Sequence, residues 1–273
     1  MSPTGTTPRG IAYDRAGPRG RLPVLLIHAG VADRRMWDPV WTGLTAGRDV
    51  IRLDLRGYGR SGSPPDTTLR PVDDVLETLA LLDVGRCHVI GASYGAGVSV
   101  ELALARPEAV ASLLLVAPGG SLIATATDDL RAFFAAERDA LAAGDVDLAV
   151  EANLAAWVDG PTRRPDAVDP AVREDVGRMQ RLAFDITASW GGVDEQEFDP
   201  PALEQLSAVR SPTLVLVGAL DLDAVLDAAR QVVEGIDGAR LVEWQDVAHL
   251  PSSERPAAFV TLVHEWLEGP DAS

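Results

Sequence analysis

Six short runs of valine, leucine and isoleucine recur along the chain, and they constrain its fold more than any other feature of the sequence. Each run is apolar throughout instead of alternating with polar residues, and turn-forming residues bound it. Strands of this kind are typical of a parallel sheet that is buried on both faces. The runs are residues 23–28, 49–55, 87–93, 111–118, 212–220 and 239–244.

Helix signals fill most of the intervals between these runs. Apolar residues at helical spacing predict a helix over 72–82, and another is expected over 94–106, ending before the next proline. Asp38 followed by Pro39 is typical of a helix start, with Asp38 as the N-cap. A last helix is predicted over 253–267. Strands that alternate with helices in this way indicate a doubly wound α/β domain.

One long segment, residues 119–199, breaks that alternation. It carries no strand pattern, and three stretches within it have apolar residues at helical spacing. We therefore predict an α/β core made of residues 1–118 and 200–273, with residues 119–199 inserted between core strands as a helical cap.

The charge balance excludes several classes of partner and cofactor. Acidic residues number 41 and basic residues 24, which gives a net charge of −17 and disfavours nucleic acids and anionic membranes as partners. The sequence contains no lysine, so it has no Schiff-base residue, no anchor for pyridoxal phosphate and no P-loop. We expect no cofactor.

Cysteine and histidine usage argues against a metal site. Cys87 is the only cysteine, which excludes an internal disulfide and a cysteine-rich zinc site, and the four histidines lack the paired spacing of metal ligands. The N-terminal residues do not have the pattern of a signal peptide, and no apolar run approaches the roughly 18 residues of a membrane span. We therefore expect a cytoplasmic protein without a membrane partner. The sequence leaves open whether it forms a homo-oligomer.

The sequence Gly91-Ala92-Ser93-Tyr94-Gly95 indicates a serine nucleophile. It follows an apolar strand and opens a helix, which places the serine on a tight turn where small neighbours let strand and helix backbones approach. Its Oγ is then expected at the carboxyl end of the sheet, near helical N–H groups that favour developing negative charge. A glycine-rich turn with an incidental serine is the alternative.

A serine needs a base, and the position of each histidine selects one. His88 falls inside a strand, His264 in the last helix, and His28 at the end of a strand, where a structural role is expected. His249 follows the last strand run at the carboxyl end of the sheet, where a base facing Ser93 is expected. A solvated loop histidine is the alternative.

The base in turn needs a carboxylate to orient it. Asp221 lies just beyond a strand run and is the predicted acid. Asp223 resembles an N-cap of the following helix, and Asp227 is expected inside that helix. The chain order Ser93, Asp221, His249 is the order expected for this architecture.

Oxyanion donors are expected on two loops. The backbone N–H of Tyr94, directly after the nucleophile, is one candidate. Gly30, in the loop after the first long strand, is the preferred second donor, with Val31 as the alternative and as a candidate for the pocket wall.

Bulky and charged side chains supply candidates for substrate contact. Trp37, Trp157 and Trp190 are candidates for lining a substrate pocket, with packing of the loop and of the inserted helices as the alternative. The pair Arg34 and Arg35 offers charge for a substrate carboxylate, although a surface or ion-pair role is favoured.

Taken together, these segments resemble the α/β-hydrolase fold family over about residues 10–118 and 200–268. The resemblance implies a mostly parallel eight-stranded sheet with helices on both faces, a Ser-His-Asp triad and a helical cap. The stretch HAGVADRRMWDP is especially similar to the enol-lactonase and small-ester branch, although His28-Ala29 stands where the family usually has His-Gly. The matching segments are LLIHAGVADRRMWDPV, DLRGYGRSGSP, VIGASYGAGVSVELALARPEAVASLLLVAPG, LVLVGALD and VAHLPSSERP.

These observations predict a cofactor-free serine hydrolase that cleaves a small carboxylic ester or lactone through an acyl-enzyme. Three alternatives stay open: the same triad hydrolysing a carbon–carbon bond, the same triad in perhydrolysis, and a ligand receptor with slow turnover on the same fold. The natural substrate does not follow from the sequence.

Overall fold

A computed structural model describes residues 4–66, 68–196 and 198–269. Within them, eight strands form a single sheet in the order β1-β2-β4-β3-β5-β6-β7-β8. The first two strand pairs, β1 with β2 and β2 with β4, are antiparallel, and the remaining pairs are parallel. The strands are β1 (Thr4–Thr6), β2 (Ala12–Ala16), β3 (Val24–Ile27), β4 (Val50–Leu53), β5 (Cys87–Ala92), β6 (Val110–Val116), β7 (Thr213–Gly218) and β8 (Arg240–Trp244).

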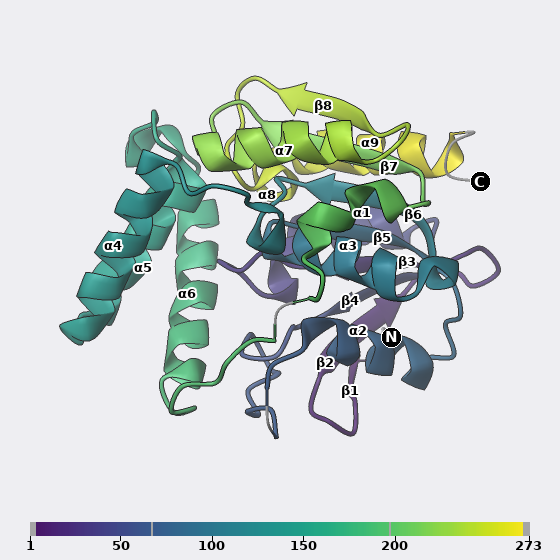
Figure 1. Ribbon diagram of the computed structural model, residues 1–273, viewed down its shortest axis with the longest axis horizontal. Helices are drawn as coiled ribbons and strands as arrows, with labels where there is room; N and C mark the ends of the chain where they lie inside the picture. The colour runs from purple at the N-terminus through teal and green to yellow at the C-terminus, as the bar shows by residue number, and fades with distance from the viewer. Residues whose placement is uncertain (1–3, 67, 197, 270–273) are drawn as a thin grey trace.

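Helices cover both faces of this sheet (Figure 1). One apolar cluster joins one face of the sheet to α2, α3 and α7, and a second cluster joins the other face to α1 and α9. The core helices are α1 (Asp38–Thr45), α2 (Pro71–Leu81), α3 (Tyr94–Ala105), α7 (Asp223–Gly235), α8 (Pro251–Glu254) and α9 (Pro256–Glu268). The predicted fold class, a mostly parallel eight-stranded α/β sheet, is confirmed.

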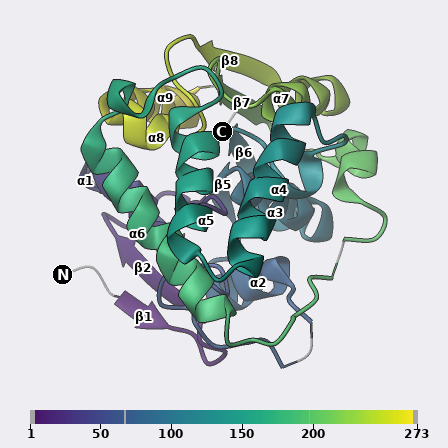
Figure 2. The ribbon, with the colours of Figure 1, turned by 90° about the vertical axis from the view of Figure 1, so that its left-hand side faces the viewer.

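Three further helices stand together beside the sheet, and we call them the cap helices (Figure 2). They are α4 (Asp128–Ala142), α5 (Val146–Asn153) and α6 (Pro170–Thr187), and a π-helical segment, Leu154–Asp159, continues α5. The division of the chain after residues 118 and 199 stays a prediction.

Two helix predictions need correction. Asp38 is the first residue of α1 and Trp37 is its N-cap, so Asp38 is not the cap. The helix expected over 253–267 is two helices, α8 and α9, because Pro256 cannot continue the hydrogen bonding of the preceding turn.

Candidate active site

Ser93 occupies the sharp turn between β5 and α3. Its backbone has φ 52° and ψ −115°, a left-handed conformation that L-residues rarely adopt and that aims the side chain out of the turn. The Ser93 N–H donates to the Val116 carbonyl oxygen of the neighbouring strand at 2.8 Å, which fixes the turn to the sheet.

Glycine is required on either side of this turn. A Cβ atom at Gly91 would lie 2.2 Å from Ser99 Oγ, and a Cβ atom at Gly95 would lie 2.5 Å from the Ile27 carbonyl oxygen. Both distances are shorter than van der Waals contact, so the strand and the helix can meet here only without these side chains. The two glycines therefore hold the serine where the sequence motif predicts it.

The structure brings Asp221 and His249 into direct hydrogen bonding. Asp221 follows β7 and His249 follows β8, and Asp221 Oδ2 lies 2.7 Å from His249 Nδ1. The other carboxylate oxygen accepts from the Leu222 N–H at 2.8 Å. Both side chains are almost completely buried, at 2% and 1% exposure of the residues. A carboxylate bound at Nδ1 holds the imidazole with Nε2 free to exchange a proton.

The rival carboxylate does not reach the histidine. Asp223 is exposed and is the first residue of α7, whose N-cap is Leu222, so the expected N-cap role of Asp223 is wrong. Its backbone N–H donates to Asp129 Oδ2 on α4 at 3.0 Å.

One cavity, of about 490 Å³, connects the predicted site residues with the cap helices. We call it the Ser93 cavity. Ser93 and His249 line it, and so do the oxyanion candidates Gly30, Val31 and Tyr94. A Cβ atom at Gly30 would lie 3.5 Å from Tyr94 Cβ, so the two loops expected to donate N–H groups are adjacent.

The three tryptophan candidates separate into one cavity residue and two packing residues. Trp157, in the π-helical segment, lines the cavity, and the centroids of its ring and the His249 ring are 4.5 Å apart. Trp37 is fully buried against Phe259, with ring centroids 6.0 Å apart, and does not line the cavity, so the structure does not support Trp37 as a pocket residue.

Trp190 is likewise placed away from the Ser93 cavity. Its Nε1 donates to the Gly62 carbonyl oxygen at 3.3 Å, and its ring covers the loop around Gly57. This loop contact explains the residue without a substrate, so the expectation that Trp190 lines the pocket is not supported.

Both arginines of the pair form ion pairs within the protein, and Arg34 is buried whereas Arg35 is exposed. Arg34 Nε lies 2.9 Å from Asp14 Oδ2, and the same guanidinium also binds Asp54. Arg35 pairs with Asp33 at 2.6 Å. These bonds occupy both cations, as the ion-pair interpretation expects.

The other three histidines do not line the Ser93 cavity. His28 is buried, its Nε2 accepts from the Leu55 N–H at 2.9 Å, and burial lowers its pKa. His88 Nδ1 lies 2.8 Å from Ser112 Oγ, and burial lowers the pKa of His88 to about 4. His264 lies in α9.

Sequence reasoning missed several cavity residues because no motif marks them. Tyr58, from the loop after β4, lines the cavity next to His28, and burial raises its pKa. Glu137, Asn153 and Gln180 line it from the cap helices. The helical spacing of Leu130, Phe133, Phe134 and Leu141 indicated a helix, but it did not reveal which of its side chains face a cavity.

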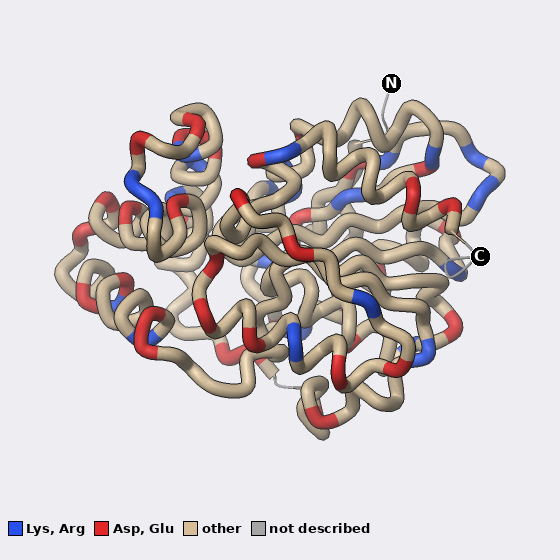
Figure 3. The backbone as a smooth tube through the Cα atoms, turned by 90° about the horizontal axis from the view of Figure 1, so that it is seen from above, with Lys and Arg blue, Asp and Glu red and all other residues tan. Residues whose placement is uncertain are grey.

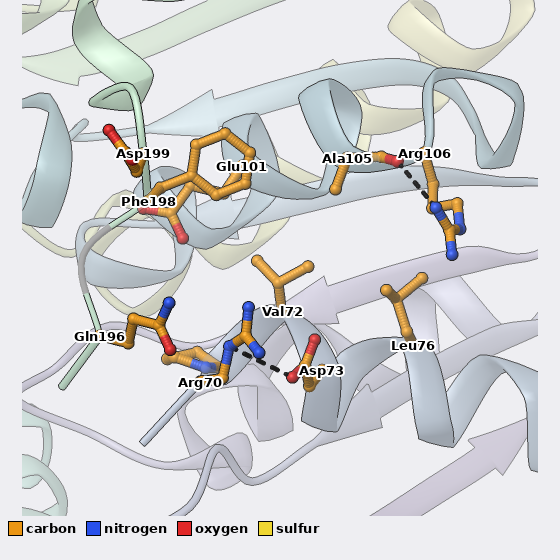
Figure 4. Close-up of a pocket in the computed structure, with 11 residues that line it drawn as sticks. Arg70, Val72, Asp73, Leu76, Glu101, Ala105, Arg106, Gln196, Phe198 and Asp199 are labelled. Atoms are coloured by element: carbon orange, nitrogen blue, oxygen red, sulfur yellow. Dashed lines mark hydrogen bonds and ion pairs between the residues drawn. The ribbon is translucent and has the colours of Figure 1, made fainter. Parts of the chain in front are cut away.

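A second cavity, of about 280 Å³, lies between α2, the end of α3 and the side chains of Gln196, Phe198 and Asp199 (Figure 4). None of the residues predicted for catalysis lines it. Arg70 pairs there with Asp73 at 3.4 Å, and burial raises the pKa of Glu101. Its described lining residues include no serine, histidine or cysteine, so this cavity does not compete with the Ser93 cavity as an acyl-transfer site.

The described residues offer neither a metal-binding cluster nor a membrane-spanning helix. No group of three or more histidine, cysteine or acidic side chains is arranged to hold a metal ion within residues 4–66, 68–196 and 198–269. In those same ranges, no helix has the length and apolar character needed to cross a bilayer.

Known proteins share both the sequence pattern and the fold. A family model described as "alpha/beta hydrolase fold" matches residues 23–256. The chain is 29% identical to a putative non-heme bromoperoxidase of Mycobacterium tuberculosis, over 93% of this chain and 95% of that protein. It is 28% identical to a strigolactone esterase of Pisum sativum, over 86% and 88%. The crystal structure of an enol-lactonase from Burkholderia xenovorans superposes with a TM-score of 0.75 at 22% identity, covering 98% of this chain and all of that one.

Proposed function

Because the chain belongs to the α/β-hydrolase fold family, we propose that it is a cofactor-free serine hydrolase acting on a small carboxylic ester or lactone. The observation that carries the proposal is the buried Asp221–His249 hydrogen bond at the wall of a cavity that Ser93 also lines. The likeness to a strigolactone esterase supports the same reaction class, and the enol-lactonase shares the fold.

In the proposed mechanism, Ser93 Oγ attacks the substrate carbonyl carbon while His249 Nε2 takes the hydroxyl proton. Asp221 holds the imidazole and stabilises its cation. The N–H groups of Gly30 and Tyr94 bind the oxyanion, and Val31 is the alternative to Gly30. His249 then gives its proton to the leaving alcohol oxygen, which departs and leaves the acyl group on Ser93.

Deacylation repeats these roles with water. His249 removes a proton from water, the hydroxide attacks the acyl carbon, and the proton returns to Ser93 Oγ as the carboxylic acid leaves. Trp157, packed on the His249 ring, shields this step from bulk solvent. For a lactone, the leaving alcohol stays attached to the acyl chain until deacylation.

Covalent labelling and a substrate screen test the proposal together. A fluorophosphonate probe should label the wild-type protein at Ser93, and the protein should hydrolyse p-nitrophenyl acetate or butyrate, or γ- and δ-lactones, over many turnovers. Ser93→Ala should abolish both. Labelling of another residue contradicts the assigned nucleophile, and binding without turnover contradicts the assigned enzyme activity.

A further inference from the structure

The cap side of the Ser93 cavity carries three polar side chains that the proposed chemistry does not use. Glu137 comes from α4, Asn153 ends α5 and Gln180 lies on α6, so each cap helix contributes one of them (Figure 2). Otherwise this side of the cavity is lined by apolar and aromatic residues, among them Phe133 and Phe184. Polar groups in such a wall need partners, because burial without hydrogen bonds is costly.

The hydrogen bonds fix which atoms remain available at Asn153 and Glu137. Asn153 Nδ2 donates to Glu137 Oε2 at 2.5 Å and to the Ala149 carbonyl oxygen at 3.0 Å. Both amide hydrogens are then used, which sets the orientation of the amide and leaves Oδ1 as an acceptor. Glu137 keeps its second carboxylate oxygen, which is also an acceptor.

Gln180 supplies the observation that points to a ligand. The residue is 5% exposed, yet its Oε1 has no hydrogen-bond partner among the residues that the structure describes. A side chain that served only to tie cap helices together would have its partner within the cap. This oxygen is itself fully buried, but rotation about the terminal torsion of the side chain exchanges it with the amide nitrogen and brings the acceptor to the cavity that Gln180 lines, where a donor on an entering molecule would pair with it.

The charges around the cavity indicate which charge the donor group of a ligand would carry. Glu137 is the only carboxylate among the described lining residues, and no arginine is among them. Glu137 also lies close enough to Tyr58, across the cavity, to contribute to the raised pKa of that phenol. A substrate carboxylate would meet acceptors and like charge here, whereas an ammonium or hydroxyl group would satisfy them.

We propose that Glu137, Asn153 and Gln180 form an acceptor subsite that selects esters carrying a hydrogen-bond donor, above all an ammonium group, away from the reacting carbonyl. The subsite rests on the proposed ester hydrolysis. It makes this chain a poor hydrolase for esters or lactones whose distal group is anionic.

Four matched esters test the subsite. They are p-nitrophenyl esters of phenylacetic acid that bear aminomethyl, hydroxymethyl, ethyl or carboxymethyl at the 4-position, so size changes little while the distal group changes. We expect kcat/KM for the aminomethyl ester to exceed that for the ethyl ester by about tenfold, with the carboxymethyl ester slowest. Glu137→Gln should bring the aminomethyl-to-ethyl ratio close to one. Gln180→Met should lower the hydroxymethyl-to-ethyl ratio.

Asp139→Asn is the matched control, since Asp139 lies on the same helix but is exposed and binds Arg138 outside the cavity. It removes one negative charge and should leave both ratios unchanged. Equal rates for all four esters, or a lead for the carboxymethyl ester, overturn the subsite while leaving ester hydrolysis intact. If the aminomethyl-to-ethyl ratio falls as much in Asp139→Asn as in Glu137→Gln, the subsite is also overturned. The preference would then come from the overall charge of the protein. Failure to hydrolyse any ester, p-nitrophenyl acetate included, overturns the proposed function instead.

Discussion

At Ser93, the functional side chain and the local backbone strain can be separated by substitution. Ser93→Ala removes the nucleophile but keeps a β-carbon in the left-handed conformation of φ 52°. We expect ester turnover to fall on the order of 10³-fold or more with the thermal midpoint nearly unchanged. Ser93→Gly should be equally inactive but more stable by roughly 1 kcal/mol, because glycine adopts this conformation without strain. Urea denaturation and steady-state kinetics measure both effects, and an active alanine variant would rule Ser93 out.

The orienting acid is distinguished from its neighbour by a paired substitution. Asp221→Asn should lower kcat by roughly 10³- to 10⁴-fold, because an amide favours the wrong imidazole tautomer and leaves the imidazolium unpaired. Asp223→Asn should leave kcat within a factor of two or three, since Asp223 is exposed and neither caps α7 nor contacts His249. Reversed phenotypes would move the acid to Asp223.

The strands and helices that could be predicted are those whose own residues carry the pattern that identifies them. The six apolar runs correspond to β3–β8. Of these, β3–β7 are buried throughout, as their composition indicates, whereas β8 lies at the edge of the sheet and is largely exposed. β2 was missed because it carries Asp14 and Arg15. Arg34 and Arg52 pair with Asp14, and Asp49 pairs with Arg15, so the charges are neutralised by residues distant in sequence.

Site residues likewise could be predicted where the local sequence places them, and could not where their position depends on contacts with distant residues. Ser93 and His249 follow strand runs and could be placed at one edge of the sheet by topology alone. Side chains of the inserted segment could not, because helical spacing defines a face but not what the face meets. Trp157 therefore faces the cavity while Trp190 packs on a loop, although both are aromatic residues of one segment.

A side chain added in place of glycine should destabilise the protein far more at the junction of β5 and α3 than on the cap helices. Gly95→Ala places a Cβ atom 2.5 Å from the Ile27 carbonyl oxygen, so we expect a loss of roughly 2–3 kcal/mol in unfolding free energy, or failure to fold. Gly177→Ala on α6 meets Leu154 Cδ1 at 3.4 Å, an ordinary contact. It should therefore stabilise by roughly 0.5–1 kcal/mol through helix propensity. Urea denaturation of both variants checks the contrast, and equal effects would show that crowding does not set the turn.

Across the protein as a whole, charge and site point to the same kind of substrate. Acidic residues occur on both the core and the cap helices, in keeping with the net charge of −17 (Figure 3). A field of this sign slows the approach of anions and favours neutral or cationic ligands. It acts at long range and is weakened by salt, whereas the acceptor subsite acts at contact. A preference for ammonium esters that persists at high salt would therefore come from the subsite.

The stability of the folded protein should decline on mild acidification because of its buried histidines. His88 is 4% exposed and its pKa is lowered to about 4, mainly by burial. An unfolded histidine has a pKa near 6.5, so above this pH His88 is neutral in both states and its contribution is complete. Between pH 6.5 and 4 the unfolded chain binds a proton that the folded protein does not, and the unfolding free energy falls.

Comparison of the wild type with His88→Gln isolates this contribution. Glutamine can still hydrogen-bond to Ser112, 2.8 Å from the imidazole Nδ1, but it does not titrate. The wild type should therefore lose about 1 kcal/mol more than the variant between pH 7.5 and 5.5, and more again by pH 4.5. Urea denaturation at these pH values gives both free energies. Carboxylates titrate alike in the two proteins, as does His28, whose pKa is also lowered by burial, so these groups cancel in the difference. A difference that stays constant from pH 7.5 to 4.5 would show that His88 binds its proton equally well in the folded protein.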